Sequence, residues 1–369
     1  MRELFEISSS SGTHAVCLSD QPLSAIAGQS QCDVIVADEF FRPQLSELSK
    51  PVLYVTAEEP SKDFANIAPI VEQLRRTGLT RNGTILAVGG GVIQDIACFV
   101  ASVYMRGTRW IYVPTTLLGM VDSCIGGKSS INVGDFKNLV GTFYPPEKII
   151  IPPSVTASLP PEHIAAGRAE AAKICFAHGE ETFRRYLELD SDPASDAGPL
   201  IAHSLAAKKW FIEVDEFDRA ERLLLNFGHS FGHALESCTA YALPHGVAVG
   251  IGCLAAVNLS CQREPGLDDH PLVHSLRSQI NSILSGLPGL SEALADVERQ
   301  SFFQYWNSDK KHGPDLYRPI LLDADARLYR ASLPRNDDSA HAIWSAFSGT
   351  SRALRPARSE FDQVDDMLA

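Results

Sequence analysis

Two histidines in the second half of the chain have the spacing of a metal-binding pair. His229 and His233 stand four residues apart in a stretch with helical periodicity, so both side chains project from one face of a helix, about one turn apart. The residues beside them are apolar, which indicates a face turned toward the interior. Imidazole is a common zinc ligand, so the pair predicts one side of a metal site. Two core histidines held by hydrogen bonds are the alternative.

Two other segments carry side chains that could complete this site. Glu170 lies three residues before Lys173 in an alanine-rich helical stretch, and His245 begins another predicted helix. Together, Glu170, His229 and His245 would offer three protein ligands and leave a position open, as in a catalytic zinc site. Glu170 and Lys173 could instead form an ion pair on the helix surface, worth about a few tenths of a kcal/mol.

A strand-like run, three glycines and a helical run follow one another in the first half. Thr84–Val88 leads directly into Gly89, Gly90 and Gly91, and helical periodicity runs from Val92 to Tyr104. Glycines let the backbone approach a pyrophosphate, and the helix N-terminus offers free N–H groups and a partial positive charge. The pattern favours a nucleotide site, although it is not the G-x-G-x-x-G fingerprint and a plain turn is the alternative.

Polar residues near the ends of neighbouring strands could surround the same ligand, because strand ends gather around ligands in such folds. They are Asp95, Thr115, Thr116, Glu59 and Lys62. Glu59 and Lys62 could meet a ribose, and a solvated ion pair is the equal alternative.

An irregular, glycine-rich segment from Val121 to Gly141 carries Asp122, Lys128, Lys137 and Asn138. Loops on a rigid sheet often carry function, and two lysines with an asparagine suit an anion such as a phosphate ester. A solvated loop is the alternative.

More cations flank the histidine pair. Lys208, Arg222 and Asn226 precede it, and Arg222 lies seven residues, or two turns of one helix face, before His229. The run Asp309–His312 adds positive charge, with a charged surface turn as the alternative.

Composition bounds the class of protein. The 369 residues include 45% hydrophobic and 21% charged residues, as in an ordinary globular protein with room for two domains. A net charge of −13 without a basic block argues against nucleic acid and anionic membranes as partners, but not against an anionic small substrate. The eight cysteines are scattered without a C-x-x-C pair, there is no signal-peptide pattern, and no apolar run is expected to reach membrane-spanning length. A cytoplasmic protein is the expectation.

The order of elements predicts two domains. Strand-like runs at 34–38, 51–56, 84–88, 110–114 and 148–151 alternate with helical runs at 64–79 and 92–104, which is typical of an α/β, Rossmann-like domain with a mostly parallel sheet. After Pro153 the predicted elements are helices, at 161–186, 199–214, 221–238, 246–263 and 271–285. We therefore expect a nucleotide-binding domain at 1–153 and a mostly α-helical domain at 154–369, ending in a polar helix or frayed tail from Arg352.

Seven runs taken together resemble one family. They are GGGVIQD, YMRG, VPTTLLGMVDSCIGGKSSIN with KNLVG, GRAEAAK, RLLLNFGHSFGHALE, PHGVAVG and DKKH, within roughly residues 34 to 312. In these runs the chain resembles the sugar phosphate cyclases and is most similar to the 3-dehydroquinate synthases. That resemblance implies a dehydroquinate synthase-like fold with NAD and zinc as cofactors, and cobalt also suits such ligands.

The resemblance also implies a role for each matching residue. NAD would be held by Asp38, Glu59, Lys62, Gly89, Gly90, Gly91, Asp95, Thr115, Thr116 and Lys137. Zinc would be bound by Glu170, His229 and His245. The substrate would be surrounded by Asp122, Lys128, Asn138, Lys173, Lys208, Arg222, Asn226, His233 and Lys310 or Lys311. Arg106 would reach the phosphate bound by a neighbouring subunit, which implies a homodimer.

The implied substrate is 3-deoxy-D-arabino-heptulosonate 7-phosphate, an anionic sugar phosphate, and the implied product is 3-dehydroquinate in the shikimate pathway. A ring alcohol would be oxidised transiently by NAD, phosphate would leave by elimination, the hydride would return, and an aldol closure would form the carbocycle. Lys208 and Arg222 would pair the carboxylate, while Lys128, Asn138, His233 and the neighbour's Arg106 would hold the phosphate.

Departures from the family pattern leave rival functions open. The segment between Asp38 and Glu59 is short, the run after Lys311 lacks the usual Ile-Gly, and Val247 replaces the glutamate of the family's His-Gly-Glu. The last change predicts that no carboxylate supports His245. One alternative is a cyclase of specialised metabolism that acts on sedoheptulose 7-phosphate or an amino analogue. Another is a metal-dependent NAD alcohol dehydrogenase, and a third is an inactive binding subunit.

Overall fold

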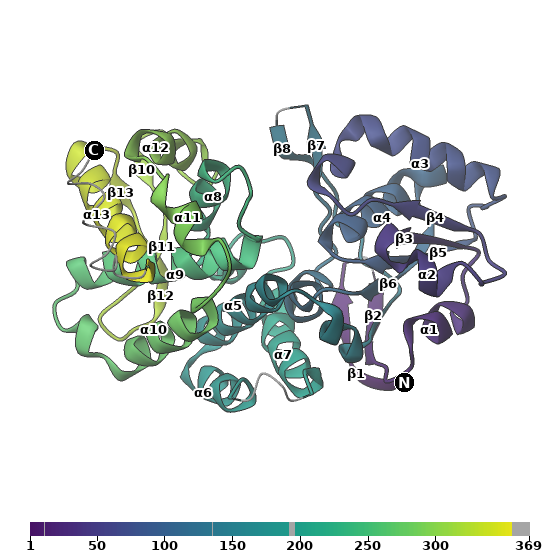
Figure 1. The fold of residues 1–369 in the computed structure, drawn as a ribbon, viewed down its shortest axis with the longest axis horizontal. Coiled ribbons are helices and arrows are strands. Elements are labelled where there is room, and N and C mark those ends of the chain that lie inside the picture. Colours follow the sequence, from purple (N-terminus) through teal and green to yellow (C-terminus); the bar gives the residue numbers. More distant parts are fainter. Residues whose placement is uncertain (11, 135, 192–195, 356–369) are drawn as a thin grey trace, which may run out of the picture. The chain divides into compact units, whose positions relative to one another are not determined.

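The structure is a computed structural model that describes residues 1–10, 12–134, 136–191 and 196–355 (Figure 1). The chain forms two compact units, Met1–Arg222 and Leu223–Ala369, called unit 1 and unit 2 below.

Unit 1 contains a seven-stranded sheet in the order β1-β2-β9-β6-β5-β3-β4, parallel except for the β1–β2 hairpin. Its strands are β1 (Arg2–Ser9), β2 (Gly12–Leu18), β3 (Val34–Asp38), β4 (Val52–Val55), β5 (Thr84–Gly89), β6 (Arg109–Pro114) and β9 (Lys148–Ile151). All five strands predicted in the first half are present within a residue or two, and the N-terminal hairpin was not predicted. The hairpin β7 (Ile131–Val133) and β8 (Phe136–Val140) stands outside this sheet.

Helices cover the strands of unit 1 because these strands are apolar on both faces. Ile35 and Ala37 of β3 pack in one core cluster with Leu23 and Ile26, whereas Val34 and Val36 point to the opposite face. The helical elements up to β6 are α1 (Leu23–Gln29), η1 (Glu39–Phe41), α2 (Arg42–Leu45), η2 (Glu59–Lys62), α3 (Phe64–Arg76), α4 (Gly91–Val103) and η3 (Tyr104–Arg106). Helix α4 packs on β3, β5 and β6.

Three long helices complete unit 1. The later elements are η4 (Gly119–Ser123), η5 (Pro153–Ser158), α5 (Pro161–His178), α6 (Glu180–Leu189) and α7 (Gly198–Val214). The single helix predicted for 161–186 is two helices, because Gly179 between them has φ +138. Helices α5 and α7 pack against η4, so unit 1 extends past the boundary predicted at Pro153.

Unit 2 is built around one buried helix. Its elements are α8 (His229–Cys238), α9 (His245–Arg263), η7 (Leu267–Asp269), α10 (Pro271–Leu284), α11 (Leu290–Ala295), α12 (Arg299–Ser308), β10 (Leu316–Tyr317), β11 (Ile320–Leu322), β12 (Leu328–Arg330), β13 (Leu333–Pro334) and α13 (Asp337–Leu354). Helix α9 contacts α8, α10, α13 and β11. By length and composition alone this helix could cross a membrane, but 78% of its apolar 18-residue window is buried inside the structure, as in a core helix.

The predicted helix 221–238 is interrupted. The 3-10 helix η6 (Glu221–Asn226) precedes α8, and Gly228 between them has φ +77. A Cβ at Gly228 would lie 2.6 Å from the Cys253 sulfur, so both the turn and the contact with α9 require glycine. Arg222 therefore does not share a helix face with His229, which corrects the two-turn prediction. Helix α13 was not predicted, and the polar helix or frayed tail predicted from Arg352 falls mostly on residues from 356 onward, which lie outside the described residues.

Candidate active site

The strand order of unit 1 reverses at the carboxyl ends of two strands, the place where a ligand crevice is expected in such sheets. From β3 the chain passes to β4 on one side and then to β5 on the other side of β3. At such a reversal the connections diverge and leave room for a ligand. Asp38 ends β3 and Gly89 ends β5, so the predicted cofactor residues of these two strands lie at this point. Burial raises the pKa of the Asp38 carboxyl, which also accepts a hydrogen bond from the Phe40 N–H.

The glycine turn after β5 allows close backbone packing at the start of α4. A Cβ at Gly90 would lie 2.8 Å from the Cγ2 of Thr116, so a side chain there would displace the next turn. The Thr115 N–H donates to the Gly89 carbonyl at 3.0 Å, and the Thr116 hydroxyl accepts from the Gly119 N–H at 3.1 Å. The free N–H groups at the N-terminus of α4 are thus held beside Thr115 and Thr116, an arrangement that fits a pyrophosphate.

Four of the predicted cofactor residues form a connected charged network, defined here as Glu59, Lys62, Asp95 and Lys137. The Lys62 ammonium lies 2.8 Å from Asp95 and 3.5 Å from Glu59, and Lys137 lies 3.6 Å from the same Glu59 oxygen. Burial raises the pKa of Asp95 to about 6, although Lys62 opposes this rise. Burial disfavours the charged form of Lys62, but Asp95 and Glu59 together outweigh it and raise its pKa. The solvated-pair alternative for Glu59 and Lys62 is wrong, because Lys62 is buried.

A second polar group in unit 1 is positive. Lys128, Lys208 and Arg222, called the cation group below, come from the segment after η4, from α7 and from η6. Lys208 lies 2.6 Å from the Asp122 carboxylate, and Lys128 lies 2.7 Å from Asp218. Burial lowers the pKa of Lys128, and the charges of Arg222 and Lys208 add to that effect. The three cations are therefore close enough to repel one another.

The loop before η6 holds Arg222 in place. The Asp215 carboxylate accepts hydrogen bonds from the N–H groups of Arg219, Ala220 and Arg222, and the Arg222 guanidinium donates to the Glu216 carbonyl at 2.6 Å. A Cβ at Gly126 would overlap the Arg222 guanidinium, so a glycine is needed where this side chain passes.

Four other predicted residues of unit 1 lie outside these groups. Glu170 and Lys173 form an ion pair on α5, and both side chains are buried, so the surface-pair alternative is wrong. Arg106 is exposed and has φ +68, an uncommon conformation for a residue with a side chain. Asn138 is exposed on β8 and has φ +53.

The histidine cluster of unit 2 consists of His229, His233 and His245. One nitrogen from each ring lies within 4.8 Å of the others, close enough for all three to share a metal ion. His229 and His233 lie one turn apart on α8, as predicted, and His245 begins α9. The prediction assigned His233 to the substrate and Glu170 to the metal. Glu170 belongs to unit 1, and its role as a ligand stays a prediction.

Hydrogen bonds orient two of these rings. His229 Nδ1 lies 3.3 Å from the Phe227 carbonyl oxygen, and His245 Nδ1 lies 3.2 Å from both Glu236 oxygens. Carbonyl and carboxylate oxygens only accept, so each Nδ1 carries the proton and each Nε2 keeps its lone pair for a metal. The cluster therefore fits a divalent metal. The expectation that no carboxylate supports His245 was wrong, because Glu236 on α8 does so.

The DKKH run lies beside this cluster. The Ser230 hydroxyl donates to Asp309 at 3.0 Å, and Lys311 lies 3.7 Å from Asp309. Burial lowers the pKa of His233 to about 3, and the charge of Lys311 adds to the effect, whereas Lys310 is exposed. Of the two candidate lysines, Lys310 and Lys311, it is therefore Lys311 that lies near His233. Asn226 donates through its side chain to the Leu223 carbonyl at 3.0 Å.

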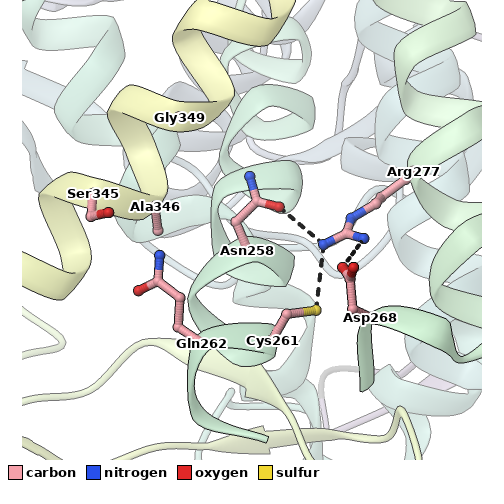
Figure 2. Close-up of a pocket in the computed structure, with 8 residues that line it drawn as sticks. All are labelled: Asn258, Cys261, Gln262, Asp268, Arg277, Ser345, Ala346 and Gly349. Carbon is pink, nitrogen blue, oxygen red and sulfur yellow. Dashed lines mark hydrogen bonds and ion pairs between the residues drawn. The ribbon is translucent and has the colours of Figure 1, made fainter. Parts of the chain in front are cut away.

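A separate cavity of about 390 Å³ in unit 2 contains none of the predicted site residues. Figure 2 shows the Arg277 guanidinium directed at Asp268, Asn258 and Cys261 in its wall. These contacts tie α10 to α9 and η7, so we assign Arg277 a structural role.

Sequence reasoning missed three polar residues in these groups. Glu236 lies seven residues after His229 on α8, a helical spacing that could have revealed it. Asn132 lies within a quoted family run, and its buried amide donates to Glu59 at 2.8 Å. No sequence pattern pointed to Asp218, because its contact with Lys128 joins two residues that lie 90 positions apart in the chain.

Comparisons with known proteins identify the group of relatives. A family model described as 3-dehydroquinate synthase N-terminal matches residues 52–166, and one described as 3-dehydroquinate synthase C-terminal matches residues 167–312. The 3-dehydroquinate synthase of Lactiplantibacillus plantarum is 37% identical over 268 residues, which cover 72% of this chain and 73% of that protein.

Two solved structures have the same fold. A 2-deoxy-scyllo-inosose synthase complexed with carbaglucose-6-phosphate, NAD+ and Co2+ gives a TM-score of 0.79 at 21% identity, covering 93% of this chain and 99% of that one. The 2-epi-5-epi-valiolone synthase of Streptomyces hygroscopicus subsp. jinggangensis, with NAD+ and Zn2+ bound, gives a TM-score of 0.74 at 23% identity. The match covers 92% of this chain and 97% of that one. At these identities the likeness concerns the fold alone, and it agrees with the predicted fold class.

Proposed function

The chain belongs to the 3-dehydroquinate synthase family, and from that membership we propose that it converts 3-deoxy-D-arabino-heptulosonate 7-phosphate to 3-dehydroquinate and phosphate. It would thus be a phosphate-eliminating cyclase of the shikimate pathway. The substrate carries a carboxylate and a phosphate at opposite ends, so its site needs cations for each of these two groups.

The observation that carries the proposal is the cation group of unit 1. Lys208 and Arg222 are buried, whereas the Lys128 side chain is 44% exposed. Burial lowers the pKa of Lys128, and the charges of Arg222 and Lys208 lower it further, while Asp218 engages Lys128 and Asp122 engages Lys208. Bringing like charges together at a buried site is unfavourable unless an anion binds there. An anionic substrate end would gain from this concentration of positive charge and a neutral end would not, so the group favours a substrate with anionic ends.

In this proposal the residues of the chain divide the work by charge. Lys208 and Arg222 bind the carboxylate, and Arg222 offers two parallel donors. Lys128, Asn138 and His233 bind the phosphate together with Arg106 of the partner subunit, which makes the enzyme a homodimer. Burial lowers the pKa of His233 to about 3, so the ring is neutral at neutral pH and would bind the phosphate by donating a hydrogen bond through its N–H.

NAD and a divalent metal are the proposed cofactors. The crevice expected at β3 and β5, the turn at Gly90 and the charged network would hold NAD, and His229 and His245 with Glu170 would hold zinc or cobalt. When bound, the metal polarises a substrate alcohol and NAD accepts its hydride temporarily. A cytoplasmic location is also proposed, supported by eight free cysteines, since disulfides are rare there.

The test compares two substrates in parallel. The purified protein, loaded with zinc and NAD, is incubated with 3-deoxy-D-arabino-heptulosonate 7-phosphate or with sedoheptulose 7-phosphate, and phosphate release and product mass are measured. We expect release from the acid with a product of dehydroquinate mass. Phosphate release only from sedoheptulose 7-phosphate, which has no carboxylate, would contradict the proposal and indicate a cyclase of specialised metabolism. Accumulation of NADH with simple alcohols and no phosphate release would indicate a dehydrogenase.

A further inference from the structure

Asn132 on β7 connects two segments that the proposed function assigns to different ligands. Its side chain is 6% exposed, and both ends of the amide are used. The Nδ2 group donates to the Glu59 carboxylate at 2.8 Å, and Oδ1 accepts from the Asn138 N–H at 2.9 Å. Glu59 belongs to the proposed NAD site, and Asn138 belongs to the proposed phosphate site.

The bond to Asn138 compensates for an irregularity in the β7–β8 hairpin. Ile131 pairs with Val140 and Val133 pairs with Phe136, so one residue of β7 faces three residues of β8. Such a bulge leaves backbone N–H groups without a strand partner. The side-chain oxygen of Asn132 takes the place of the missing backbone acceptor for Asn138.

That bond also holds an uncommon backbone conformation. Asn138 has φ +53, which asparagine adopts more readily than most residues but which still needs support from its surroundings. The conformation determines where the Asn138 side chain points. Asn132 thus controls the direction of a proposed phosphate-binding group without touching the phosphate.

The bond to Glu59 acts on the cofactor side. Glu59 Oε1 is shared by Asn132, Lys62 and Lys137, and the Asn132 amide is its shortest contact with these groups. Two further contacts tie the hairpin to the same region, since Asn132 forms a backbone bridge with Asp63 and the Gly134 N–H donates to the Asp63 carboxylate. Movement of the hairpin would therefore move Glu59 as well.

We propose that Asn132 is a positioning residue that holds Glu59 and the backbone of Asn138 in one fixed arrangement, so that NAD and the phosphate end of the substrate bind cooperatively. The inference rests on the proposed function for the identity of the two ligands. Cooperative binding requires that each ligand favour the same arrangement, and linkage makes the effect reciprocal.

The test measures NAD binding by calorimetry on the full chain, without and with inorganic phosphate as a non-reacting probe. For the wild type we expect phosphate to lower the Kd of NAD severalfold. Asn132→Ala loses both hydrogen bonds, so the Kd of NAD should rise about tenfold and its dependence on phosphate should disappear. Asn132→Asp keeps the acceptor for the Asn138 N–H, but its carboxylate repels the Glu59 carboxylate. This variant should therefore raise the Kd of NAD, while the substrate KM at saturating NAD should change less than twofold.

Asn66→Asp is the matched control, because the exposed Asn66 amide bonds only to the Pro60 carbonyl in the neighbouring segment. Its NAD binding should match the wild type, and thermal unfolding should show that all variants are folded. If Asn132→Ala keeps the wild-type Kd and phosphate dependence, or if Asn66→Asp loses them equally, the inference is overturned. NAD binding coupled to phosphate, without turnover of either sugar phosphate, would support the role of Asn132 and overturn only the proposed function.

Discussion

The charged network of unit 1 is assembled from three separate parts of the chain, whereas the histidine cluster of unit 2 comes from one short stretch. Glu59 and Lys62 lie on η2, and Asp95 and Lys137 lie on α4 and β8. The three histidines and Glu236 all lie within residues 229–245, on α8 and at the start of α9.

This difference affects how each region can fail. In the network, every charged group is stabilised by a partner from another element, so removing one partner leaves a buried charge. In the cluster, backbone geometry within one helix already brings two rings together, and a hydrogen bond only orients the third. We therefore expect network mutations to reduce stability and cluster mutations to reduce metal binding.

The largest effect is expected for His245→Ala. Loss of one histidine should abolish stoichiometric zinc binding and lower the rate of phosphate release at least about 10³-fold, because metal polarisation contributes several kcal/mol to such reactions. Metal content and phosphate release measure the outcome. His341→Ala, at an exposed position on α13, is the control and should behave as the wild type. A variant that retained full metal content would contradict the assignment of His245.

Lys62→Met should have the next largest effect, on stability. It leaves Asp95 buried without its main cation, which should cost about 3 kcal/mol at pH 8 in urea unfolding. The folded-state pKa of Asp95, about 6, already exceeds its ordinary value, so the folded state holds the proton more tightly and acidification favours folding through this group. Without Lys62 this pKa should rise further. The cost should therefore be smaller at pH 5 than at pH 8, and an equal cost at both would argue against the charge explanation.

Glu236→Gln should weaken metal binding without preventing it. The amide keeps the size of the side chain but holds the His245 N–H less strongly, and loss of such a partner typically costs about 10- to 100-fold in metal affinity. Competition with a zinc-sensitive dye measures the affinity. Glu292→Gln, at an exposed position on α11, provides the comparison. Unchanged affinity in Glu236→Gln would mean that the ring of His245 is held by packing alone.

The smallest effect is expected for an exposed ion pair outside both regions. Arg184 and Glu180 lie 2.6 Å apart on α6, with side chains 69% and 55% exposed. Glu180→Gln should change the free energy of unfolding by about 0.3–0.5 kcal/mol, since solvent screens the pair. Chemical denaturation checks this value. A cost near that of Lys62→Met would remove the distinction between buried and exposed charges on which the comparison depends.

The sequence predicted the sheet and much of the candidate site because these depend on local patterns. Apolar runs such as Val34–Asp38 are strands since only a buried strand accommodates them, and glycines after β5 predict a close backbone turn. The helix predicted through Gly179 and the one predicted through Gly228 were both wrong at those glycines. A positive φ depends on what packs nearby, and periodicity does not reveal it.

From the amino-acid sequence one can read which residue types could do the chemistry and the four-residue spacing that brings His229 and His233 together. The folded structure was needed to see that Glu236 supports His245, that Asp218 contacts Lys128, and that Asn132 links Glu59 to Asn138. Spacing on one helix is fixed by the geometry of the backbone hydrogen bonds. Contacts between distant segments depend on how whole elements pack, and a single sequence does not record those distances.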